Sequence, residues 1–149
     1  MKKQTVELHR VLMTTPEKIY RAFLEADAYA RWLPPNGFTA RVHQMDAREG
    51  GRYSMSFTNF TTGNSHTFGG IYQELIPHSL IRYTAIFDDP NLPGEMETRV
   101  SVTPVSCGTE LSIVQSGIPE VIPTEGCYLG WQESLQHLAR LVEPEIPDE

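Results

Sequence analysis

The stretch that decides the fold is residues 122–143, Ile-Pro-Thr-Glu-Gly-Cys-Tyr-Leu-Gly-Trp-Gln-Glu-Ser-Leu-Gln-His-Leu-Ala-Arg-Leu-Val-Glu. At about 3.6 residues per turn, one arc of this predicted helix collects Cys127, Tyr128, Trp131, Ser134, Leu135, Leu138, Ala139, Leu141 and Val142. The opposite arc is polar except for Leu129. A helix of this kind must lie on an apolar surface, and the strands predicted before it are the one partner of matching size.

Two glycines, Gly126 and Gly130, lie inside the predicted helix. Each weakens a helix by about 1 kcal/mol relative to alanine, so packing or function must compensate. A sheet that holds one long helix can enclose a pocket. The pattern therefore favours a binding domain without naming its ligand.

Between residues 38 and 117 the apolar period changes to two, which is typical of strands. Strands are predicted at 5–13, 38–43, 52–57, 66–76 and 80–87, around Val100 and Val102, and at 109–116. Gly50-Gly51 reads as a turn and Gly69-Gly70 as a bend in the sheet. The short spacing between strands predicts an antiparallel meander.

Two short helices are predicted after the first strand. Thr15 and Pro16 are typical of the N-cap and first position of a helix, and Asp27 is expected to cap a second helical turn over Ala28–Trp32. Helices at both ends of a run of strands indicate an α+β domain.

Composition narrows the classes of partner. A net charge of −7 with no basic run argues against nucleic acid and anionic membranes. No stretch approaches the ~18 apolar residues of a membrane span, and the first eight residues lack the apolar segment of a signal peptide. Cys107 and Cys127 are expected to be reduced thiols, with a disulfide between them as the minor alternative. A cytoplasmic protein, monomer or homodimer, is expected.

Several short motifs, taken in their order, point to a known family. They are Pro16 with Ile19-Tyr20 and Ala22-Phe23, Arg31-Trp32-Leu33-Pro34, Gly37-Phe38-Thr39, Glu49-Gly50-Gly51-Arg52-Tyr53, Gly70-Ile71-Tyr72-Gln73-Glu74-Leu75-Ile76-Pro77, Thr103 with Gly108-Thr109-Glu110-Leu111, and Gly130-Trp131 with Leu135 and Leu138. The chain resembles the activator of HSP90 ATPase homolog 1-like family, within the START-like (SRPBCC, polyketide-cyclase-like) superfamily.

This resemblance covers nearly the whole chain and implies one START-like domain over residues 1–149. The implied fold is the helix-grip: a curved antiparallel sheet of about seven strands around a long C-terminal helix, with a cavity between them. Small stand-alone relatives look like binders of small apolar or aromatic molecules. The alternatives are a chaperone partner, as for the two-domain namesake, and a polyketide cyclase or dehydratase-like enzyme.

The candidate ligand-binding residues are mostly aromatic. They are Trp32, Tyr53, Met55, Phe57, Phe68, Tyr83, Phe87, Gln115, Trp131 and Leu135. Two interpretations remain open, because buried aromatic side chains fill cores as well as line pockets. Gln115 could hold a ligand or satisfy a backbone group at a strand end. Trp131 is expected to be largely buried against the concave face of the sheet, with Tyr53 or Phe57 nearby.

Catalytic and metal motifs are missing from the sequence. The five histidines show no zinc-site spacing, and no nucleophile elbow or phosphate-binding glycine loop occurs. His66, in phase with Phe68, could lie at the cavity mouth but reads more readily as a surface residue. Glu74 and Arg82 are expected to form a structural ion pair. No cofactor is expected, and binding is favoured over catalysis.

Overall fold

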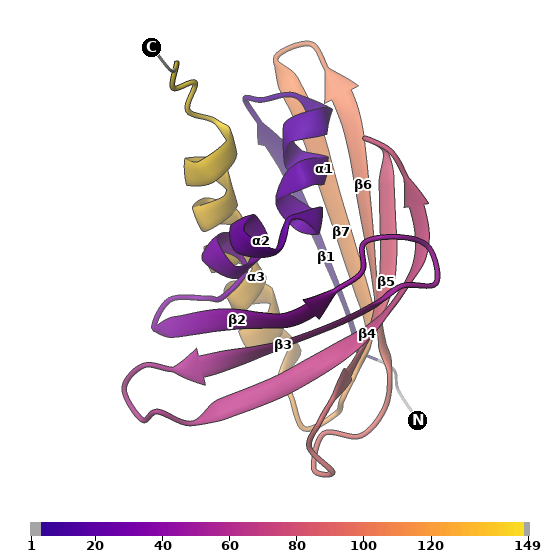
Figure 1. Ribbon diagram of the computed structural model, residues 1–149, viewed down its shortest axis with the longest axis vertical. Coiled ribbons are helices and arrows are strands. Elements are labelled where there is room, and N and C mark those ends of the chain that lie inside the picture. Colours follow the sequence, from indigo (N-terminus) through magenta and orange to yellow (C-terminus); the bar gives the residue numbers. More distant parts are fainter. Residues whose placement is uncertain (1–3, 148–149) are drawn as a thin grey trace.

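The computed structural model describes residues 4–147, which form one curved antiparallel sheet and three helices (Figure 1). The elements are β1 (Gln4–Leu12), α1 (Pro16–Leu24), α2 (Ala26–Trp32), β2 (Phe38–Met45), β3 (Arg52–Asn59), β4 (Ser65–Ile76), β5 (Leu80–Phe87), β6 (Met96–Val105), β7 (Gly108–Ile118) and α3 (Thr124–Val142). The seven strands are ordered β1-β7-β6-β5-β4-β3-β2. The predicted α+β helix-grip class and order of elements are confirmed.

The start of α1 follows the predicted capping pattern, whereas the prediction for α2 was wrong by two residues. The Thr15 hydroxyl accepts a hydrogen bond from the Lys18 amide at 3.3 Å, and Pro16 opens the helix. In α2, Glu25 occupies the N-cap position and Asp27 lies within the first turn. A single extended residue, Glu25, separates the two helices, so Asp27 is already helical and cannot be the cap.

The sheet changes direction along β4 and β5. Figure 1 shows β2 and β3 crossing the direction of β6 and β7. At the bend, a Cβ atom on Gly70 would lie 2.0 Å from the Thr84 carbonyl oxygen. The Thr84 hydroxyl accepts a hydrogen bond of 3.0 Å from the Ile71 amide. The Tyr53 phenol donates a hydrogen bond of 2.7 Å to the Thr84 carbonyl. Hydrogen bonds from side chains thus replace part of the backbone hydrogen bonding between β4 and β5. Gly70 allows this close approach because it has no side chain.

Helix α3 lies across the concave side of the sheet, in contact with β1 and α2. Trp131, Leu135, Leu138 and Val142 are buried as predicted. Tyr128 was predicted on the same arc, but it is 40% exposed. Within residues 4–147, none of the helices combines the length and apolar character that crossing a membrane requires.

Candidate functional site

A cavity of about 370 Å³ lies between α3 and the sheet. Side chains from α2, the loop after it, strands β2 to β7 and the first half of α3 form its walls. The cavity reaches the surface, because the exposed residues His66 and Gly126 are part of its lining. Its size falls within the range of about 300–1,000 Å³ that is usual for sites that bind small molecules.

Seven of the ten candidate residues line this cavity. They are Tyr53, Phe57, Phe68, Tyr83, Phe87, Gln115 and Trp131. Trp32, Met55 and Leu135 are not among its lining residues and are buried in the core, at 0%, 0% and 3% exposure. Trp32 is held there by a hydrogen bond of 2.8 Å from its indole nitrogen to the Ala22 carbonyl. Trp131, Tyr53 and Phe57 all line this one cavity.

Four half-buried phenylalanines cross the sheet side of the cavity. Phe38, Phe57, Phe68 and Phe87 come from the neighbouring strands β2, β3, β4 and β5, and we call them the phenylalanine row. Successive ring centroids are 6.4, 5.0 and 5.9 Å apart. Each ring meets the next at an angle between 53° and 81°. The row is a continuous aromatic wall that presents both ring edges and ring faces.

Gln115 connects the sheet to α3 through its side-chain amide. Its Oε1 accepts hydrogen bonds from the Trp131 indole nitrogen at 3.1 Å and from the Cys127 thiol at 3.2 Å. Its Nε2 donates to the Thr98 hydroxyl at 3.1 Å. Of the two roles considered for Gln115, the backbone one is wrong: its described partners are side chains of α3 and β6.

Buried tyrosines form the polar part of the wall. The Tyr29 and Tyr83 hydroxyl oxygens are 3.1 Å apart. Burial raises the pKa of both phenols, and burial together with the neighbouring phenols raises the pKa of Tyr53. These groups therefore remain protonated at neutral pH and act as neutral hydrogen-bonding groups.

Two glycines leave open space on the helix side of the cavity. Gly126 and Gly130 both line the cavity, and a Cβ atom built on either would have no heavy atom within 4 Å. One turn later the Ser134 hydroxyl donates to the Leu33 carbonyl at 2.5 Å. The two glycines are therefore not required by close packing. From the sequence, these two glycines were recognised only as residues that weaken the helix and therefore need a compensating role.

The described lining of the cavity has no acidic side chain and neither lysine nor arginine. The one histidine among these described lining residues, His66, is exposed. Every described buried side-chain nitrogen or oxygen has a hydrogen-bond partner. The predicted pair of Glu74 and Arg82 is confirmed at 3.4 Å, from Oε1 to Nε, and neither residue lines the cavity.

The lining residues that could not be selected from the sequence alone include Tyr29, Phe38 and Met96. Tyr29 reaches the cavity because α2 packs beside β2, and Phe38 because β2 is the last strand of the sheet. Met96 lies at the start of β6 after a long loop. All three depend on how distant elements pack, which a local pattern does not encode.

The chain is similar in sequence and in fold to known proteins. The family model described as Activator of Hsp90 ATPase homolog 1-like protein matches residues 13–143. The crystal structure of protein CV1439 from Chromobacterium violaceum has 57% identity and a TM-score of 0.94, over 95% of this chain and 98% of that one.

More distant structures share the fold. A protein from Rhodobacter sphaeroides is 18% identical with a TM-score of 0.80, over 94% of this chain and 97% of its own. Protein Ms6760 from Mycobacterium smegmatis is 14% identical with a TM-score of 0.79, over 99% of both chains. None of the curated proteins compared with the chain matches it.

Proposed function

This chain belongs to the Activator of Hsp90 ATPase homolog 1-like family, and we propose that it is a binding module for a small apolar or aromatic ligand. The cavity between the sheet and α3 carries this proposal. Its volume of about 370 Å³ is more than twice the roughly 150 Å³ of an engineered apolar cavity that takes up benzene. Aromatic and aliphatic side chains make up most of its lining, with a few fixed polar groups, as in typical ligand sites.

The two glycines of α3 support the same proposal. Each lowers helix stability by up to about 1 kcal/mol relative to alanine, yet no neighbouring atom would obstruct an alanine methyl group at either position. Residues that weaken a helix without serving its packing are understandable if they keep space open for a ligand.

The test is a titration of the purified protein with a panel of flavonoids, polyketides and simple arenes. Trp131 lines the cavity, so occupancy should change its fluorescence or its indole NMR signal. The variant Trp131→Phe, which leaves the buried Trp32 in place, identifies the responding residue. A panel that changes neither signal, with no binding seen by calorimetry, would end this proposal.

A second candidate function comes from the family's description, which names activators of the Hsp90 ATPase. Under this alternative the chain binds a chaperone of that class and changes its rate of ATP hydrolysis. Adding the protein to the Hsp90-type chaperone of the same host tests it. An unchanged rate, together with no co-migration in gel filtration, would remove it.

Catalysis is less well supported than binding. The cavity has phenols that could donate a proton, but within the described residues no carboxylate lines it, and its one imidazole, that of His66, is exposed to solvent. Acid–base catalysis requires a group that accepts a proton as well as one that donates it. Recovery of bound probes unchanged after prolonged incubation is the expected result.

A further inference from the structure

The cavity has a marked chemical selectivity that the proposed function does not specify. We propose that it selects an uncharged ligand with a flat aromatic ring, which binds against the phenylalanine row. This proposal rests on the proposed function, since it names the class of ligand that the same site would take.

The exclusion of charge follows from the lining. An ionised ligand would lose its water and find no opposite charge, because none of the described lining residues is an aspartate, glutamate, lysine or arginine. Several of the polar groups in the lining already have hydrogen-bond partners within the protein. Gln115 Oε1 accepts two hydrogen bonds, and the Tyr53 hydroxyl donates a hydrogen bond to the Thr84 carbonyl oxygen. An ionised group would therefore gain few hydrogen bonds in return for the water that it loses.

One neutral polar atom can nevertheless be accommodated. The Gln115 amide nitrogen carries two hydrogens, and the structure describes one hydrogen bond from it, to Thr98. The second hydrogen is available to an oxygen acceptor on the ligand, such as a ring hydroxyl or a carbonyl group. The site therefore fits an apolar body with a single uncharged oxygen.

The preference for a flat ring follows from the shape of the two walls. The Phe57 and Phe68 rings meet at 81° with centroids 5.0 Å apart, so the row offers edges and faces to an added ring. On the helix side, Gly126 and Gly130 have no side chains, and the space beside them is open. A flat aromatic ring in this cavity gains edge and face contacts with the phenylalanine row that a puckered, saturated body cannot make.

Four small probes separate charge from shape. Naphthol and naphthoate differ in charge at similar size, and naphthalene and decalin differ in flatness while both are uncharged. Titrations at neutral pH should show naphthol binding at least about tenfold more tightly than naphthoate. Naphthalene should bind roughly two- to tenfold more tightly than decalin, although burial of apolar surface alone would favour decalin.

Substitutions then locate the selectivity in the protein. Phe68→Leu should reduce the preference for naphthalene over decalin, because it removes a ring from the row but keeps the wall apolar. Gly130→Leu should weaken all probes that bind, by filling the gap, without lowering the melting temperature. Gln136→Ala, on the exposed face of the same helix, is the control and should leave binding unchanged.

The outcomes distinguish this proposal from the broader one. If naphthoate or decalin binds as tightly as its partner, the protein is a binding module but the selectivity proposed here is wrong. The selectivity is also wrong if Phe68→Leu leaves the preference for naphthalene intact. If none of the four probes binds, the selectivity proposed here is wrong, whereas the proposed function fails only if the flavonoids and polyketides of the wider panel do not bind either.

Discussion

The Trp131 indole nitrogen donates a hydrogen bond of 3.1 Å to the side-chain oxygen of Gln115, which joins α3 to β7 at the cavity wall. The Cys127 thiol shares this acceptor, so the oxygen uses both of its lone pairs. This arrangement turns the Gln115 nitrogen toward Thr98. The position of the helix, the orientation of the amide and the polarity of the wall therefore depend on one another.

Trp131→Ala should destabilise the protein by about 3–5 kcal/mol, because it removes a large buried side chain and enlarges the cavity. Trp131 is 8% exposed, so most of its surface is lost from contact with water on folding. Urea unfolding measures the change. Trp131→Phe is the matched control and should cost less, since it keeps a ring and leaves only the Gln115 oxygen short of a partner. A loss below about 1 kcal/mol for the alanine variant would show that Trp131 serves recognition rather than packing.

Gly70→Ala should lower the free energy of unfolding by at least about 2 kcal/mol. The new methyl group would lie 2.0 Å from the Thr84 carbonyl oxygen, and backbone on both strands would have to move. Thermal unfolding checks this expectation. A variant as stable as the parent would mean that the bend between β4 and β5 has room that the structure does not indicate.

The same substitution on α3 should have the opposite effect. Gly126→Ala and Gly130→Ala should each raise the free energy of unfolding by up to about 1 kcal/mol, because their methyl groups meet no heavy atom within 4 Å. Binding of a cavity ligand should weaken at the same time. Higher stability with unchanged affinity would contradict a role for the glycines in keeping the cavity open.

Alkaline pH should unfold the protein through its buried tyrosines. Burial raises the pKa of Tyr29, Tyr53, Tyr72 and Tyr83 above the value of about 10 found in unfolded chains. Above pH ~10 the unfolded state loses these protons first, so stability is full below that pH and falls as pH rises toward the folded pKa values, by up to about 1.4 kcal/mol per pH unit for each tyrosine.

Urea unfolding at a series of pH values measures this slope. Tyr72→Phe is the informative variant, because it removes one titrating group and should make the loss of stability less steep. A stability that stays constant between about pH 9 and 11 would be inconsistent with four buried phenols.

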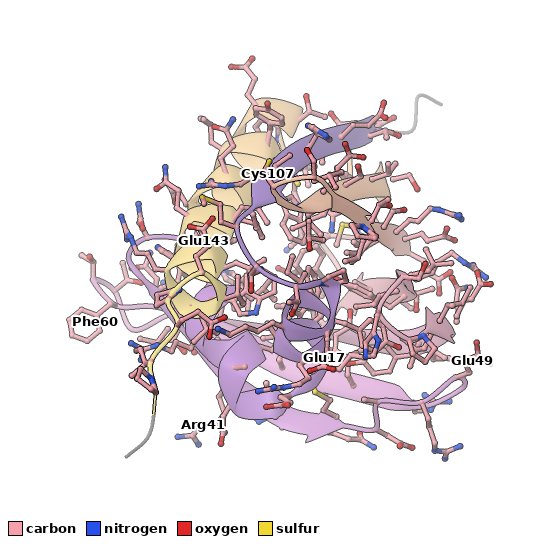
Figure 2. All side chains as sticks on the ribbon, turned by 90° about the horizontal axis from the view of Figure 1, so that it is seen from above. Glu17, Arg41, Glu49, Phe60, Cys107 and Glu143 are labelled. Carbon is pink, nitrogen blue, oxygen red and sulfur yellow. The ribbon has the colours of Figure 1, made fainter. Side chains whose placement is uncertain are left out.

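The two cysteines should differ in reactivity. Cys107 is exposed at the turn between β6 and β7 (Figure 2), whereas Cys127 is partly buried in the cavity wall and burial raises its pKa. Because the thiolate is the reactive form, Cys107 should be modified first. In the variant Cys107→Ser, the rate at which a thiol reagent labels Cys127, measured by mass spectrometry, should fall when a cavity ligand is added. Equal rates with and without ligand would place the ligand elsewhere.

Much of the fold could be predicted because its signals are local. Thr15 and Pro16 mark the start of α1, and the alternation of Ile81, Tyr83 and Ala85 marks the buried face of β5. The arc of Trp131 and Leu135 identifies the buried face of α3. Each of these signals lies within a few residues of sequence. Helix capping and the apolar periods of two and 3.6 residues depend only on near neighbours in the chain.

The cavity was only partly predictable, because packing at long range decides which aromatic side chains meet it. Trp32 and Tyr29 lie three residues apart in α2, yet Trp32 donates to Ala22 in the core and Tyr29 reaches Tyr83 in the wall. Nothing in the local pattern separates these two fates. From the sequence, Gly126 and Gly130 are recognised only as residues that weaken the helix. The open space beside them is evident only from the structure.

The pairing of β1 with β7 has a consequence for the time at which the chain can fold. Leu8 pairs with Ile113, and β1 lies at the edge of the sheet with β7 as its neighbour. On the ribosome, at about 5–20 residues per second, β1 emerges on the order of ten seconds before the strand that it joins. During that interval its apolar residues have no sheet to cover them. Among the seven strands, β1 therefore waits longest for its neighbour, because every other pair joins strands that are consecutive in the chain.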